Sequence, residues 1–178
     1  MIERYDWARL NHLQIGRYAE YFVKMELTLH GFEVYTAEVD DRGVDLVMRK
    51  TGHSFYEVQV KSVRGLNYIF FRKSKFQLRP SLMAAVVLFQ QLKPPALFLI
   101  ESERRLHLDP LFVSRDYEDN ESEPEWGLNL SEKNRPLLET FRFDQTKGVR
   151  LRHSTIERPW HKEQSHPFNL IRFWIVAA

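Results

Sequence analysis

Two uninterrupted apolar runs, Leu82–Phe89 and Ala96–Ile100, constrain what this chain can fold into more than any other feature. Each run has the length of a strand, and the Pro94-Pro95 pair separates them. Such runs are typical of strands buried in a sheet, and both are far shorter than the roughly 18 apolar residues that cross a membrane. They predict a soluble protein with buried strands and no membrane partner.

The length of 178 residues is that of one ordinary domain with a real core, with room for an appendage. The chain has no cysteine, which excludes disulfides, cysteine-ligated zinc, iron–sulfur clusters and a thiol nucleophile. Its first six residues, Met1 to Asp6, show no secretory signal pattern, so we expect a cytoplasmic protein.

The periodicity of the chain predicts an α/β fold, with a helix first, then strands, then a final helix. The first helix should run from Asn11 to His30, end at Gly31, and bury a stripe formed by Leu13, Gly16, Val23 and Leu27. Strands are expected at Phe32–Thr36, Val44–Arg49, Phe55–Lys61, Tyr68–Phe71, Ala84–Phe89 and Ala96–Ile100, with a short edge strand at Trp126–Leu130. Ser131–Phe141 should be helical, and periodicity is lost from about Gln145. These patterns divide the chain into a domain at 1–145 and a basic tail or arm at 146–178.

Charge is distributed in blocks, although the formal net charge is only +2. Residues 58–100 carry seven basic side chains and no acidic one, while residues 101–125 carry nine acidic and three basic side chains. A basic block of this kind attracts phosphate, but a solvated basic face on an ordinary domain is an equally good interpretation.

Four polar residues interrupt the apolar pattern: Glu20, Asp45, Gln59 and Lys61. Glu20 falls inside the expected helical stripe, and Asp45 lies in a strand just after a glycine. Gln59 and Lys61 are two residues apart, so they share one face of their strand. Each has an ordinary explanation on its own. Glu20 could lie at the edge of the stripe and reach solvent, and Asp45 could accept hydrogen bonds from the amides of the turn. Gln59 and Lys61 could belong to the polar, half-exposed face of a strand.

Taken in order, these residues resemble a known pattern. Gly16-Arg17-Tyr18-Ala19-Glu20, the Leu27–Phe32 stretch, Gly43-Val44-Asp45-Leu46 and Gln59-Val60-Lys61 are similar to the motifs of the PD-(D/E)XK nuclease superfamily. The resemblance is greatest to the branch of Mrr-type endonucleases and Holliday-junction resolvases, which uses Gln-x-Lys. The sequence departs from the PD-(D/E)XK motif at two positions. Val44 occupies the position of the motif's Pro, and Gln59 occupies the position where Asp or Glu is usual.

The resemblance implies a restriction-endonuclease-like core, a central mixed sheet flanked by helices, and a metal-dependent DNA endonuclease that hydrolyses phosphodiester bonds. By the same resemblance, Mg²⁺ (or Mn²⁺ in its place) is held by Asp45, the Gln59 side-chain carbonyl and the Val60 backbone carbonyl. Glu20 binds a second metal or orients a ligand, and Lys61 positions the attacking water and stabilises developing charge. Many relatives act as dimers or tetramers, so a homo-oligomer stays open.

The basic block begins at Lys61 and supplies candidate contacts to the DNA backbone. These are Arg64, Tyr68, Arg72, Lys73, Lys75 and Arg79. If the nuclease interpretation holds, this block should flank the site and the acidic segment should lie away from the DNA. Two alternatives remain: a catalytically inactive DNA-binding module on the same fold, and a structural or partner-binding domain in which the four residues do not converge.

Overall fold

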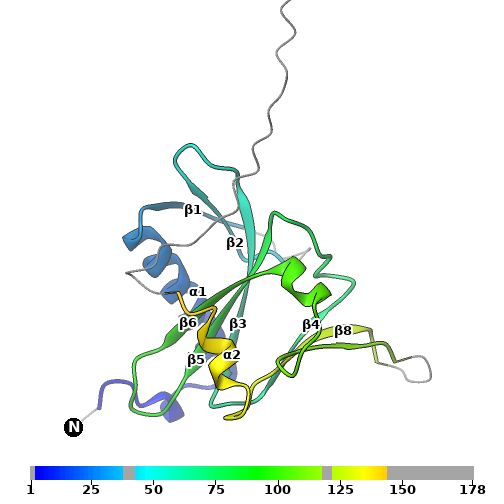
Figure 1. Cartoon of the computed structure of the whole chain (residues 1–178). Helices are drawn as coiled ribbons and strands as arrows, with labels where there is room; N and C mark the ends of the chain where they lie inside the picture. Colours follow the sequence, from blue (N-terminus) through cyan, green and yellow to red (C-terminus); the bar gives the residue numbers. More distant parts are fainter. Residues whose placement is uncertain (1–2, 38–42, 118–121, 144–178) are drawn as a thin grey trace, which may run out of the picture.

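The structure is a computed structural model, and it describes residues 3–37, 43–117 and 122–143. The basic tail at 146–178 lies outside the described residues. The chain begins with a short 3-10 helix, η1 (Trp7–Arg9), followed by the long helix α1 (His12–Leu29). Figure 1 shows α1 on one side of the central strands, with β4 and β8 on the other.

Helix α1 begins and ends as its sequence predicts. The side chains of Asn11 and Gln14 each accept a hydrogen bond from the other's backbone amide at 2.9 Å, which forms a capping box. Gly31 follows the helix with a φ of +77°, the left-handed conformation that glycine adopts without strain.

The buried stripe of α1 differs from the predicted one. It consists of Ile15, Ala19, Val23 and Leu27. Leu13 is 71% exposed, and Glu20 lies at the edge of the stripe rather than within it, with its side chain 23% exposed. The core therefore contacts a face of the helix rotated away from Leu13.

A central sheet of five strands carries the expected apolar runs. Its strands are β1 (Phe32–Thr36), β2 (Leu46–Lys50), β3 (Tyr56–Arg64), β5 (Leu82–Phe89) and β6 (Ala96–Glu101), in the spatial order β1-β2-β3-β5-β6. The pair β3–β5 is parallel and the other neighbours are antiparallel, so the sheet is mixed. Strand β5 has every residue buried, because both faces of the sheet are covered.

A second sheet of three strands covers the face opposite α1. It consists of β4 (Tyr68–Arg72), β8 (Glu125–Asn129) and β7 (Phe112–Arg115), in the order β4-β8-β7. The strand predicted at 126–130 is present as β8. It is the central strand of this sheet and not an edge strand, because it pairs with β4 on one side and with β7 on the other. Strand β4 is inserted in the crossover between the parallel strands β3 and β5.

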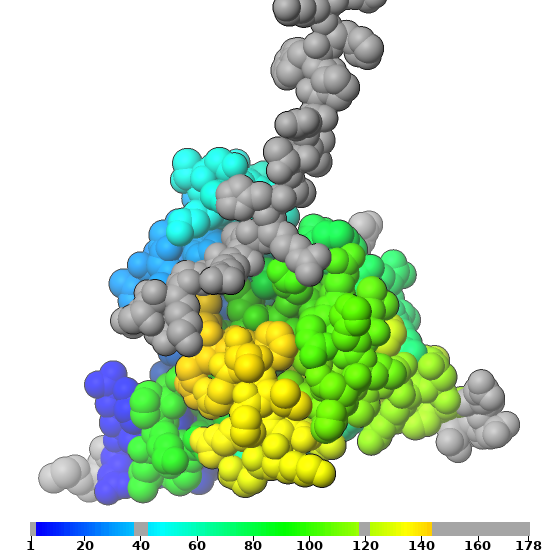
Figure 2. Space-filling view, viewed as in Figure 1, coloured from blue at the N-terminus to red at the C-terminus, as the bar shows by residue number. Residues whose placement is uncertain are grey.

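The remaining elements are short. They are η2 (Ser102–Leu106) and α2 (Arg135–Glu139), so the helix predicted over 131–141 forms little more than one turn around Leu138. After α2 the chain reaches β6, where the amide of Leu99 donates to the carbonyl of Phe141 at 3.0 Å. Figure 2 shows this closing segment in yellow against the green part of the chain.

Alternate residues of β5 belong to two separate cores. Met83, Ala85, Val87 and Phe89 pack with α1, while Leu82, Ala84, Val86 and Leu88 pack against the second sheet. The predicted α/β class with a central mixed sheet is confirmed. One face of that sheet is covered by a helix and the other mainly by strands. No helix in the described ranges is long and apolar enough to span a membrane.

Candidate active site

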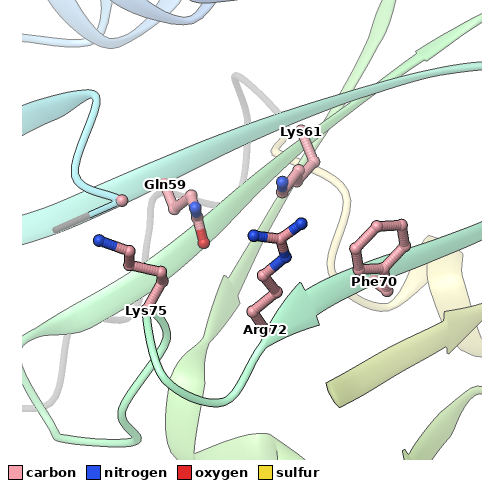
Figure 3. Close-up of a pocket in the computed structure, with 6 residues that line it drawn as sticks. Gln59, Lys61, Phe70, Arg72 and Lys75 are labelled. Atoms are coloured by element: carbon pink, nitrogen blue, oxygen red, sulfur yellow. The ribbon is translucent and has the colours of Figure 1, made fainter. Parts of the chain in front are cut away.

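A pocket of about 270 Å³ lies between β3 and β4. It is lined by Gly43, Gln59, Lys61, Phe70, Arg72 and Lys75. Gln59 and Lys61 come from β3, Phe70 and Arg72 from β4, and Lys75 from the turn after β4 (Figure 3). The alternation predicted for the Gln-x-Lys strand thus holds, since both side chains face this pocket.

Gln59 is the most unusual residue of the pocket. It is 9% exposed, and its Oε1 is buried without a hydrogen-bond partner among the residues that the structure describes. Figure 3 shows this oxygen directed into the space between Lys75 and Arg72. A buried acceptor without a partner costs about 1–3 kcal/mol, so it marks a place where a cation or a ligand donor would be stabilising.

Gly43 lets the backbone approach Gln59 closely. Its φ is +72°, and a Cβ built on it would lie 2.8 Å from Nε2 of Gln59 and 3.4 Å from Cβ of Lys75. A larger residue at this position would have to displace the Gln59 side chain. The glycine of the Gly-Val-Asp-Leu stretch therefore shapes the pocket directly.

Asp45 lies where β2 and β3 separate. The last residue pair of these strands is Leu46 with Val58, and the Asp45 amide still donates to the Val58 carbonyl at 3.0 Å. Beyond that point Oδ2 of Asp45 accepts a hydrogen bond from the Val60 amide at 2.6 Å. In a strand the amide and carbonyl of one residue point to the same side, so the Val60 carbonyl is directed to the side where Asp45 lies.

Lys61 projects toward the second sheet. Its Nζ lies 5.9 Å from the ring centroid of Phe70 and 5.7 Å from that of Phe71. These distances are within the range of cation–π attraction, which helps to hold the ammonium at the pocket.

Glu20 is placed apart from the other three. It forms an ion pair with Arg17 at 2.6 Å on α1. Helix α1 packs on the face of β3 that presents Val58 and Val60, whereas Gln59 and Lys61 face the second sheet. The structure therefore brings Gln59 and Lys61 together and joins Asp45 to the intervening Val60, while Glu20 lies on the opposite face of the sheet.

Two of the six residues expected to contact DNA line the pocket, and the other four do not. Arg72 and Lys75 line the pocket. Arg64 donates to the Leu10 carbonyl, and Arg79 forms an ion pair with Glu57.

Tyr68 and Lys73 are held within the second sheet. The Tyr68 hydroxyl donates to Glu125 at 2.7 Å, and burial together with this bond raises the pKa of Tyr68. Lys73 pairs with Asp116 at 2.6 Å and lies 4.3 Å from the Trp126 ring centroid. Both residues therefore stabilise the fold of this sheet.

Part of the acidic segment contacts the basic block. Glu123 pairs with Arg72 at 3.5 Å and accepts a hydrogen bond from Ser74 at 2.9 Å, and Asp116 pairs with Lys73. These contacts place two acidic residues of the segment beside basic residues of the block, and the expectation that the segment lies away from the DNA stays a prediction. Antiparallel pairing of β4 with β8 brings the ends of the two charge blocks together, because Arg72 lies opposite Glu125.

The oxygen donors at the site fit a magnesium ion. Mg²⁺ is commonly held by one or two carboxylates together with several waters. Asp45 supplies the carboxylate, and the unpartnered Oε1 of Gln59 is the observation that fits an added cation. In the described part of the chain no three His, Asp or Glu side chains gather into a metal-binding group, so a metal ion here would depend more on the uncharged oxygens of Gln59 and Val60.

Phe70 was missed as a site residue. The sequence signal was present, because Phe70 and Phe71 must point to opposite faces of their strand, so burial of one does not require burial of the other. Phe71 is the buried one, at 1% exposed, and Phe70 is 46% exposed at the pocket.

Comparisons with known proteins give structural similarity without a sequence match. No protein-family model matches the chain, and no curated protein matches it in sequence. Among solved structures, the chain is similar to Hjc, a Holliday junction resolvase from Archaeoglobus fulgidus. The match has a TM-score of 0.45 and 16% identity, and it covers 68% of this chain and 88% of that one. At this TM-score the likeness carries no argument about the site, which depends on the residues described above.

Proposed function

We propose that this chain is a metal-dependent DNA endonuclease that hydrolyses phosphodiester bonds at the pocket between β3 and β4. The observation that carries the proposal is the buried Oε1 of Gln59, which has no hydrogen-bond partner within the described ranges, in a pocket that also contains Lys61, Arg72 and Lys75. An oxygen without a hydrogen-bond partner can coordinate a divalent cation. Three positive side chains can bind the phosphates of a nucleic acid next to that cation.

In this proposal Asp45, Gln59 and the Val60 carbonyl hold Mg²⁺, and Mn²⁺ can substitute. When bound, the ion supplies a Lewis acid and lowers the pKa of a coordinated water. The Val60 amide fixes the Asp45 carboxylate through the 2.6 Å hydrogen bond. Glu20 is left out of the ligand set because it pairs with Arg17 on the helix that covers the other face of β3.

Lys61 has the role of stabilising negative charge. Its ammonium lies over the pocket between the Phe70 and Phe71 rings, where it can hydrogen-bond a phosphate oxygen as charge develops there. Arg72 and Lys75 bind the neighbouring phosphates of the same strand. Cleavage of both strands of a duplex would need two such sites, so a dimer or tetramer remains a prediction.

The inactive DNA-binding module is the second candidate. Three cationic side chains line the pocket and, among the described residues, no carboxylate does, a balance that favours binding phosphate even without a metal. This candidate predicts DNA binding that weakens with salt, with no cleavage in any divalent metal.

A cleavage assay separates the two candidates. Supercoiled plasmid, branched DNA and single strands are each incubated with the protein in Mg²⁺ or Mn²⁺. We expect cleavage by the wild type and its loss in Asp45→Asn and Lys61→Met. Lys93→Met is the matched control, because Lys93 belongs to the same basic block but is exposed and does not line the pocket. Cleavage that persists in both site variants would overturn the endonuclease proposal.

A further inference from the structure

Phe70 presents an aromatic ring to solvent at the edge of the candidate active site. Among the large exposed apolar side chains of the described residues, it is the one that lines the pocket. Its neighbour Phe71 fills the second core, so the exposure of Phe70 is a consequence of strand alternation and not of a frayed strand. Arg72, two residues further on, shares the face of Phe70.

Positive charge lies beside this ring. The Lys61 ammonium lies 5.9 Å from its centroid, and Figure 3 shows Arg72 next to the ring and Lys75 farther along the pocket. An exposed aromatic ring beside several cations is the arrangement with which proteins bind unpaired nucleotides. The ring stacks on a base, and the cations bind the phosphates on either side.

We propose that Phe70 stacks on an unpaired nucleobase of the DNA strand in the pocket, with Arg72 and Lys75 on its flanking phosphates. This inference rests on the proposed function and adds a substrate class: single-stranded DNA, or DNA with unpaired bases, in preference to continuous duplex. Bases within a duplex are stacked on both faces, so the Phe70 ring has no free base surface to contact there. A base released from the stack offers that surface.

Binding measured without cleavage tests this inference. In metal-free buffer containing EDTA, fluorescence anisotropy compares three ligands: a thymidine oligonucleotide of about twelve nucleotides, a duplex of equal length, and an oligomer of abasic sites with the same phosphates. We expect the thymidine oligonucleotide to bind more tightly than the other two. The abasic oligomer keeps every charge, so any loss in its affinity reports the bases.

Variants of Phe70 assign the effect to one ring. Phe70→Leu keeps an apolar side chain and should weaken binding of the thymidine oligonucleotide by roughly 5- to 100-fold, while changing duplex and abasic binding by less than about twofold. Phe70→Trp should restore single-strand binding. Phe55→Leu is the control, because Phe55 is also exposed, at 50%, but packs beside Arg49 and Tyr35 away from the pocket.

The outcomes are distinguishable from those of the cleavage assay. If Phe70→Leu and Phe55→Leu bind the three ligands alike, or if the wild type binds no single strand, the stacking inference is wrong even when the protein cleaves DNA. If stacking is observed but no metal supports cleavage, the inference holds and only the endonuclease proposal fails.

Discussion

The backbone amide of Val60 donates a hydrogen bond of 2.6 Å to Oδ2 of Asp45, at the point where β2 leaves β3. The carboxylate thus satisfies an amide that the departing strand no longer reaches, and it is fixed beside Gln59. One residue therefore has a structural role at the end of a strand pair and a proposed role as a metal ligand.

Two substitutions of Asp45 separate these roles. Asp45→Asn keeps an oxygen that can accept from Val60, so its free energy of unfolding should stay within about 0.5 kcal/mol of the wild type. Asp45→Ala removes the acceptor and should lower that free energy by about 1–2 kcal/mol. Both should lose metal-dependent cleavage. Chemical denaturation and the plasmid assay check this, and equal destabilisation by both variants would contradict a role for the bond.

Much of the fold could be predicted because its signals are local. The capping residues of α1, the alternation of β3 and the apolar runs of β5 and β6 each depend on residues close in the chain. The buried face of α1 could not be read correctly, because apolar residues occur on more than one side of this helix. Leu13, Met25 and Leu29 are all about 70% exposed.

The candidate site was predictable in part, because the sequence also placed Arg72 and Lys75 among six candidate DNA contacts. Gln59 and Lys61 share a strand face, so their proximity follows from a spacing of two residues. Phe70 and Arg72 reach the same pocket through pairing of β4 with β8, a contact across more than 50 residues. That pairing also explains the meeting of Arg72 with Glu123, which the linear distribution of charge did not indicate.

Gly43→Ala should disturb the pocket through Gln59. The new Cβ would lie 2.8 Å from Nε2 of Gln59, and the positive φ adds strain of about 1–2 kcal/mol. Gly52→Ala is a matched control, because Gly52 has a φ of +80° and its new methyl group would meet no other atom within 4 Å. The two variants should lose similar stability, but only Gly43→Ala should reduce the cleavage rate, by roughly 10-fold or more. Equal rates would show that contact with Gln59 is unimportant.

Glu123→Gln should strengthen binding of DNA. The change frees Arg72 from its 3.5 Å ion pair and removes a negative charge beside the pocket. We expect affinity for the single strand to rise by about 2- to 5-fold at low salt, with a smaller gain near physiological ionic strength, where the screening length is about 8 Å.

Asp116→Asn is the control for this change in charge. It removes the same charge but releases Lys73, which does not line the pocket. Anisotropy titrations at two salt concentrations compare the variants. An equal gain in both would mean that net charge, and not the release of Arg72, sets the affinity.

Arg105 is a buried cation that the proposed chemistry does not use. It is 1% exposed, and its three guanidinium nitrogens have no hydrogen-bond partner among the described residues. Its guanidinium carbon lies 4.4 Å from the ring centroid of Phe71 and 4.7 Å from that of Phe76, so aromatic rings stabilise the charge in place of acceptors. Burial lowers the pKa of Arg105 to about 9.

Arg105→Met should therefore stabilise the protein. It fills the same space without a charge, and we expect the free energy of unfolding at pH 7 to rise by roughly 1–4 kcal/mol. Arg105→Lys should lower it, because an ammonium keeps the charge but lacks a flat surface to stack on the rings.

The pH dependence gives a second check on Arg105. Because burial lowers the pKa of this cation, the unfolded chain holds the proton more tightly than the folded one from about pH 9 up to the much higher ordinary pKa of arginine. The cost of burying the charge is fully present below pH 9 and decreases above it. The advantage of Arg105→Met over the wild type, measured by denaturant titration, should thus be constant from pH 7 to 8.5 and shrink as the pH rises toward 10.5. An advantage that grows over that range would mean that the guanidinium is stabilised in the core rather than penalised there.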